Sequence, residues 1–124
     1  MGLFNLFKEP ADDVIAVDYD AIDADLVQSN LLMCTETEER QKLIRNLSVG
    51  SIVNVKHTRK NKQNIYMVTD YRNGNVIGEL SYGTSDFLAQ NYKNHKMLGK
   101  VTEIGKITPT GRGKQVRIEY KVYL

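Results

Sequence analysis

The chain has 124 residues, of which 41% are hydrophobic and 26% charged, as is typical of a single soluble globular domain with one core. It has no apolar run of the roughly 18 to 20 residues that cross a bilayer and no signal-peptide pattern, which favours a cytoplasmic protein without integral membrane association. The net charge of +2 is unevenly distributed along the chain. Residues 1–50 carry 4 Lys or Arg and 10 Asp or Glu, whereas residues 51–124 carry 13 Lys or Arg and 5 Asp or Glu. The basic half is therefore expected to meet an anion, either a polyanionic partner or the chain's own acidic half.

We expect residues 1–48 to form an acidic N-terminal extension that ends in a helix. Thr35 and Glu38 have the spacing of a capping box, in which each side chain bonds a backbone N–H group at the start of a helix. Apolar residues then recur at helical spacing at Leu43, Ile44 and Leu47. The pattern predicts a helix over about 36–47.

The hydrophobic period then changes to that of strands, so we expect residues 49–124 to form a basic, β-rich domain. Three strands are predicted, at 51–55, 65–71 and 75–81. Asn73-Gly74 joins the last two. Asn-Gly between β runs favours a type I′ hairpin turn, which requires positive φ at both central residues.

A short helix and two longer strands are predicted to follow. Thr84 or Ser85 is the expected cap of the helix. The next strand spans 97–107, and its glycines 99 and 105 suit bulges. The last strand alternates strictly between apolar and polar residues, with Val116, Ile118, Tyr120 and Val122 on one side. The order of elements predicts an α+β fold in which β dominates: a small curled sheet or β-barrel of about five to six strands with one short helix.

No cysteine or histidine pattern nominates a catalytic or metal site. Cys34 is the single cysteine, and no base or second thiol accompanies it in the sequence, so we expect a plain buried thiol. His57 and His95 stand far apart, and we expect each to be an exposed turn or helix-end residue.

Two further patterns fall short of known ligand sites. One acidic segment carries four carboxylates, at Asp18, Asp20, Asp23 and Asp25. This segment lacks the Gly and the Glu that a calcium-binding EF-hand loop requires. Gly111-x-Gly113-Lys114 lacks the remainder of a phosphate-binding P-loop. We therefore expect a non-enzymatic protein without a metal or a cofactor.

Basic loops with interleaved tyrosines are the remaining candidates for function. Clustered Lys and Arg attract phosphate groups whatever the sequence, and aromatic rings stack on the bases of single strands. If the strands close into a barrel, the basic loops at 56–62 and 112–114 are expected to form one positive rim. The candidate nucleic-acid-binding residues are Lys56, His57, Arg59, Lys60, Lys62, Tyr66, Tyr82, Lys96, Arg112 and Lys114. The alternative for these side chains is cross-strand packing and solvated protection of sheet edges.

Three segments carry a likeness to a known family: Gly74-Asn75-Val76-Ile77-Gly78-Glu79-Leu80, Ser85-Asp86-Phe87-Leu88-Ala89 and Asn64-Ile65-Tyr66-Met67-Val68. They resemble, in that order, the G-x-x-[IV]-G-x-[IL] hairpin strand, the helix that follows it and the N-A-I-x-V strand entry of the HIRAN domain. This small β-barrel module is attached to DNA-remodelling and repair enzymes and also occurs alone in bacteria, the type to which the chain is most similar. The resemblance implies binding of single-stranded DNA, particularly at a 3′ end, with Lys56 and His57 near the nucleotide. The family's N-P-x-D-x-N loop is reduced here to Lys60-Asn61-Lys62-Gln63-Asn64, and Glu79 stands where His or Tyr is usual.

The sequence favours two functions and leaves an unrecognised enzyme or small-ligand binder as a third possibility. The first is a non-enzymatic nucleic-acid-binding module that holds single-stranded DNA on its basic rim. The second is a protein–protein interaction module whose basic face meets an acidic partner or its own acidic arm. The protein-interaction function is favoured if the acidic N-terminal extension folds back on the rim, because the extension would then neutralise the basic face.

Overall fold

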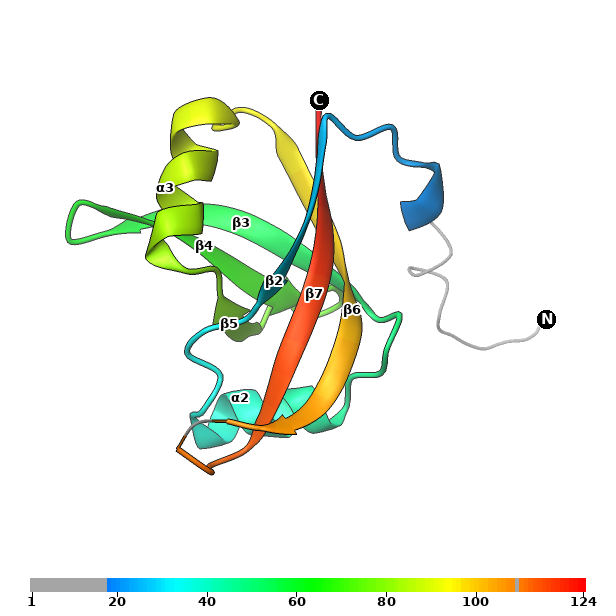
Figure 1. Ribbon diagram of the computed structural model, residues 1–124, viewed down its shortest axis with the longest axis vertical. Coiled ribbons are helices and arrows are strands. Elements are labelled where there is room, and N and C mark those ends of the chain that lie inside the picture. The colour runs from blue at the N-terminus through cyan, green and yellow to red at the C-terminus, as the bar shows by residue number, and fades with distance from the viewer. Residues whose placement is uncertain (1–17, 109) are drawn as a thin grey trace.

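The structure is a computed structural model that describes residues 18–108 and 110–124. Over this part of the chain, six antiparallel strands form one strongly twisted sheet, and two α-helices and a 3-10 helix lie beside it (Figure 1). The elements are η1 (Tyr19–Ala21), β2 (Leu26–Leu31), α2 (Glu38–Arg45), β3 (Ile52–Lys60), β4 (Gln63–Asp70), β5 (Val76–Glu79), α3 (Tyr82–Asn91), β6 (Lys96–Ile107) and β7 (Lys114–Tyr123). None of the helices in the described ranges has the length and apolar character needed to span a membrane.

The β-dominant architecture is confirmed, but the sheet does not close into a barrel. Its strand order is β2-β7-β6-β3-β4-β5, so β2 and β5 are the edges. The chain just after β2 reaches the end of β5 through one isolated bridge, in which Met33 and Glu79 exchange two backbone hydrogen bonds of 2.8 and 3.0 Å. Beyond Glu79 a helix replaces the strand: the Ser85 hydroxyl of α3 accepts a hydrogen bond from the backbone N–H of Tyr66. A side chain thus caps the edge of β4 where a strand would be needed for closure.

The predicted alternation of the last strand is confirmed. Val116, Ile118, Tyr120 and Val122 are all fully buried, and they form one core with residues of the other strands and of both α-helices. β7 lies between the edge strand β2 and β6, so its buried face forms the part of the core next to that edge of the sheet.

Part of the acidic extension belongs to the sheet. β2 pairs with β7 from Leu26 opposite Val122 to Leu31 opposite Arg117. Residues 1–17 of the extension lie outside the described residues. The predicted helix over about 36–47 is present but shorter, as α2, and its N-cap is Thr37, whose hydroxyl accepts from the Arg40 N–H. Thr35, the predicted cap, is buried instead.

The type I′ turn was predicted at the wrong hairpin. Asn61 and Lys62, between β3 and β4, have φ values of 53° and 66°, whereas at the predicted turn only Gly74 has positive φ, at 72°. There, Asp70 Oδ1 accepts hydrogen bonds from the backbone N–H groups of Asn73 and Gly74 at 2.6 and 3.2 Å. This bonding stabilises a wider turn with a single left-handed residue.

Two details of the later elements also differ from the predictions. The cap of α3 is Ser81, whose hydroxyl accepts from the Thr84 N–H, and not Thr84 or Ser85. Gly105 lies at a register shift between β6 and β7 with a φ of 138°, as expected of a bulge. Gly99 pairs regularly with Tyr120. A Cβ atom on Gly99 would lie 2.9 Å from the Glu119 carbonyl oxygen, so Gly99 permits close packing of strands.

Candidate functional site

The ten residues nominated from the sequence do not form one rim. Six of them, Lys56, His57, Arg59, Lys60, Lys62 and Tyr66, belong to β3, β4 or the turn between them, which together form a hairpin that projects from the body of the molecule (Figure 1). Arg112 and Lys114 lie at the turn between β6 and β7, near α2, and Lys96 begins β6. Since the sheet is open and strongly twisted, these groups lie at separate ends of it.

Tyr66 is a core residue in this structure. It is only 2% exposed, and its ring lies 4.9 Å, centroid to centroid, from that of His57. Its hydroxyl is buried without a hydrogen-bond partner in the described part of the chain, and burial raises its pKa. Tyr66 therefore has no face free for a nucleotide base, whereas Tyr82, at the start of α3, is 62% exposed.

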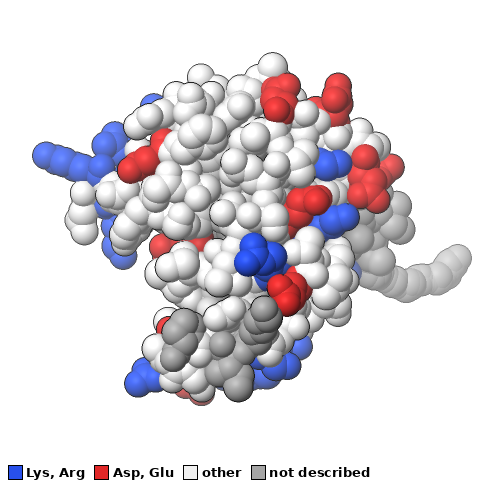
Figure 2. Space-filling view, viewed as in Figure 1, with Lys and Arg blue, Asp and Glu red and all other residues white. Residues whose placement is uncertain are grey.

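The cations of the β3–β4 hairpin are not neutralised within the described ranges. Lys56, Arg59, Lys60 and Lys62 form no ion pair there, and Figure 2 shows Lys and Arg side chains gathered at the left, where the hairpin projects. The acidic segment 18–25 contacts the other side of the sheet instead. Within the described ranges, Asp20 forms an ion pair with Lys100 at 3.6 Å, and Asp25 is hydrogen-bonded to the ring of His95 at 3.2 Å. The acidic segment 18–25 therefore does not neutralise the hairpin, which can attract an anion.

A groove lies along one side of the hairpin. We call it the hairpin groove; it has a volume of about 550 Å³. Its lining includes Arg40, Thr58, Arg59, Lys60, Glu79 and Tyr82. These residues come from α2, from β3 and from the junction of β5 with α3. The groove thus combines three cationic side chains with one exposed aromatic ring.

Arg40 is held in the groove by two contacts. Its guanidinium donates a hydrogen bond to the Cys34 carbonyl oxygen, and its Nη1 lies 3.6 Å from Glu79 Oε2. The Met33–Glu79 bridge brings these residues together from positions about 40 apart in the chain. Sequence reasoning missed Arg40 as a candidate because that bridge depends on the curl of the whole sheet.

Cys34 also lines the groove, and it is exposed, so the prediction of a buried thiol was wrong. Its φ of 59° is left-handed, which places it at a sharp change of direction between β2 and α2. Partial desolvation, followed by the charge of Glu79, raises the pKa of its thiol. The thiol is therefore protonated at neutral pH, and it is a weak nucleophile.

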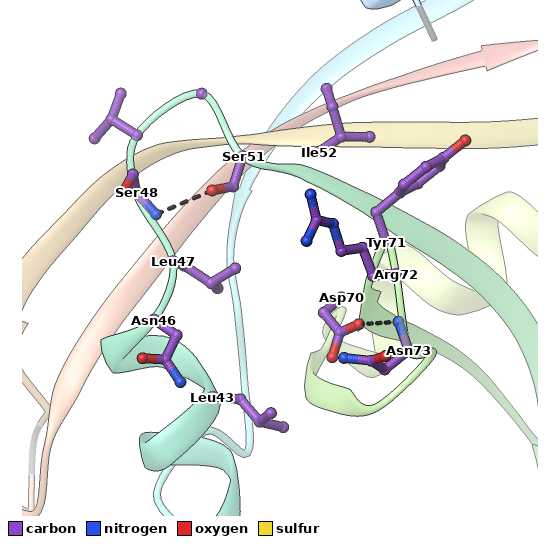
Figure 3. A pocket seen from close by; sticks show the side chains of 12 residues that line it. Leu43, Asn46, Leu47, Ser48, Ser51, Ile52, Asp70, Tyr71, Arg72 and Asn73 are labelled. Carbon is purple, nitrogen blue, oxygen red and sulfur yellow. Dashed lines mark hydrogen bonds between the residues drawn. The ribbon is translucent and has the colours of Figure 1, made fainter. Parts of the chain in front are cut away.

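A second hollow of about 590 Å³ lies between the C-terminal end of α2, the segment before β3 and the turn after β4 (Figure 3). Leu43, Leu47 and Ile52 give it an apolar side. Its polar wall includes Asp70, whose carboxylate already accepts from the backbone of the turn. None of the ten candidate residues lines this hollow.

The described residues contain no group of three or more His, Cys, Asp or Glu side chains placed to hold a metal ion. The ring of His57 is hydrogen-bonded to Asn64 Oδ1 at 2.9 Å, and the ring of His95 contacts Asp25. In comparisons with protein-family models, curated proteins and solved structures, nothing matches this chain.

Proposed function

We propose that the protein binds single-stranded nucleic acid, with single-stranded DNA the expected ligand, in the hairpin groove. The observation that carries the proposal is the combination of un-neutralised cations and an exposed aromatic ring in one groove. Arg59 and Lys60 line it without an acidic partner in the described ranges, and Tyr82 is 62% exposed beside them.

The two kinds of side chain suit the two parts of a nucleotide. Lys and Arg attract the phosphate backbone and release its counterions, which provides affinity without regard to sequence. An exposed tyrosine stacks on a base, and this needs a base whose face is not covered by its neighbours. The arrangement therefore favours single strands over duplexes, in which the base faces are occupied.

The resemblance to the HIRAN domain supports the same class of ligand. Lys56, which the resemblance places near the nucleotide, lies on the hairpin. His57 is on the same strand, although its ring is engaged with Asn64. Since the family's loop is reduced here to the tight turn at Asn61–Lys62, the proposal does not include recognition of a 3′ end.

An acidic protein surface is the alternative ligand for the same cations. It would use Arg59 and Lys60 in ion pairs but would not need a stacking ring. The contribution of Tyr82 to affinity therefore separates the two ligands.

The test is binding of labelled single-stranded and duplex oligonucleotides across a salt series. The variant carries Arg59→Gln and Lys60→Gln, and the matched control carries Arg112→Gln and Lys114→Gln, which remove the same charge at the other end of the sheet. We expect the groove variant to bind single strands more weakly and to lose about 0.7 from the log–log salt slope for each phosphate contact removed. We expect the control to keep most of its affinity.

Equal loss in both variants would show that net charge, and not the groove, governs binding. A wild-type chain that binds no oligonucleotide at about 50 mM salt would contradict the proposal and would favour the acidic protein ligand.

A further inference from the structure

Glu79 is an unexpected residue in a groove for a polyanion. Its side chain is 16% exposed, and it lines the hairpin groove together with Arg40 and Tyr82. A carboxylate repels phosphate groups, so the phosphate backbone is expected to pass along Arg59 and Lys60. Glu79 then faces another part of a bound nucleotide.

The part that suits a carboxylate is a base edge with N–H groups. An ionised carboxylate only accepts hydrogen bonds, and its two oxygens offer about four lone pairs. Arg40 Nη1 lies 3.6 Å from one of these oxygens, and the Cys34 thiol also hydrogen-bonds this carboxylate. The lone pairs that remain are available to a ligand. Bases expose such N–H groups only when they are unpaired.

Guanine matches this requirement better than the other bases. Its Watson–Crick edge places N1–H beside an N2 amino group, and the two parallel donors fit the two oxygens of a carboxylate. Adenine and cytosine each place an amino group beside an acceptor nitrogen, and thymine places one N–H between two carbonyl oxygens. Each of these three would turn an acceptor toward the Glu79 carboxylate, which is unfavourable.

The backbone holds Glu79 in place for such a contact. Its N–H and carbonyl groups form the bridge to Met33, and it pairs with Met67 in β4. Tyr82 follows three residues later, after the α3 cap Ser81. The backbone at Glu79 and at Tyr82 thus belongs to two structured elements joined by a short connection, which limits the cost of ordering the backbone on binding.

We propose that Glu79 accepts hydrogen bonds from the Watson–Crick edge of an unpaired guanine stacked on Tyr82, so that the groove prefers single strands containing guanine. This inference rests on the proposed function, because it assigns a base to the same groove. Tyr82 holds a base of any identity by stacking, and Glu79 selects among them.

The test compares short labelled oligothymidylates that carry one central guanine, adenine, cytosine or hypoxanthine. Hypoxanthine keeps the N1–H of guanine but lacks its amino group, so the comparison removes one donor in the unaltered protein. We expect the guanine strand to bind at least about fivefold more tightly than the all-thymine strand, the lower limit for a bidentate contact. The hypoxanthine strand should fall between them.

The variant Glu79→Gln should bind the all-thymine strand at least as tightly as the wild type and should lose the guanine preference, because an amide presents one donor and one acceptor. Its melting temperature checks that the fold is intact. Equal affinity of the wild type for all five strands would overturn the role of Glu79 and leave the proposed function standing. A guanine preference that persists in Glu79→Gln would also overturn it, whereas failure to bind any strand would overturn the proposed function itself.

Discussion

The hairpin β6–β7 and the hairpin β3–β4 differ in how their turns are held. At the turn of β6–β7, the side chain of Gln41 from α2 donates to the carbonyl oxygens of Thr35 and Lys114 and accepts from the Lys114 N–H. A hydroxyl hydrogen bond from Thr110 to Glu36 adds a further contact. No residue of another element in the described ranges bonds Asn61 or Lys62, at the turn of β3–β4.

The two hairpins also differ in whether their cationic side chains have acidic partners. Lys100 and Arg117 of β6–β7 have acidic partners in Asp20 and Glu103, whereas the cations of the β3–β4 hairpin have none in the described ranges. One hairpin is thus held by contacts that stabilise the fold, and the other presents charges that contribute little to stability. Four experiments test this division, from the largest expected effect to the smallest.

The largest effect is expected in the core of β7. Ile118 is fully buried, so Ile118→Ala should lower the free energy of unfolding by about 2–5 kcal/mol through lost burial and a residual cavity. Urea denaturation measures the change. Lys60→Ala, at the end of β3, is the comparison, and it should change the free energy of unfolding by less than about 0.5 kcal/mol. Similar losses in both variants would refute the division.

The next effect concerns the anchor of the β6–β7 turn. Gln41 is 5% exposed, and Gln41→Ala removes the partner of one buried backbone group, the Thr35 carbonyl, and of two part-buried groups of Lys114. We expect a loss of about 1–3 kcal/mol in the free energy of unfolding. Lys42→Ala, on the exposed side of the same helix, is the matched control and should be close to neutral. A neutral Gln41→Ala would show that the turn holds itself without α2.

A third prediction concerns binding rather than stability. Replacing the exposed Tyr82 by leucine should cost about 1–3 kcal/mol of single-strand affinity while leaving the salt slope unchanged, because stacking involves no counterions. Phe87→Leu, on the same helix and 42% exposed, controls for loss of an aromatic ring outside the groove. Fluorescence anisotropy at several salt concentrations measures both quantities. An unaltered affinity in Tyr82→Leu would favour the acidic protein ligand.

The smallest effect is expected at the unanchored turn. Lys62 has a left-handed φ of 66°, which glycine adopts without steric cost. Lys62→Gly should therefore stabilise the fold by about 0.5–1 kcal/mol. Lys62→Ala removes the same charge but keeps the Cβ atom, so it should give no gain. If alanine stabilises as much as glycine, relief of charge repulsion, and not of backbone strain, is the cause.

The sequence predicted those parts of the fold whose signal is local. The strict alternation of β7 identified its buried face because that face is apolar along its whole length. The turn at Asn61–Lys62 was missed because Asn73-Gly74 carries the stronger sequence signal, and because the polar residues at 57–63 hide the strands that flank the turn. The strand β2 was missed because its sequence, LVQSNL, has little β character without the pairing to β7.

The candidate site was predicted only in part, for a related reason. Arg59, Lys60 and Tyr82 were named from their chemistry, and all three line the hairpin groove. Tyr66 was named as well, although Ile65, Tyr66 and Val68 are all buried. A strand covered on both faces has no alternation that would reveal which tyrosine is hidden. The approach of Arg40 to Glu79 depends on the curl of the whole sheet, and no local pattern predicts it.

The Met33–Glu79 bridge also acts as a latch. It consists of two hydrogen bonds between the end of β5 and the chain just after β2, which are not otherwise paired in the part of the chain that the structure describes. It is therefore expected to open with a smaller free energy than global unfolding. Opening would separate Glu79 from Met33 and would disturb the wall of the hairpin groove. A ligand that needs this wall binds only the closed form and must shift the equilibrium toward it. Occupation of the groove should therefore slow hydrogen–deuterium exchange at the amides of Met33 and Glu79, even if the ligand covers neither amide.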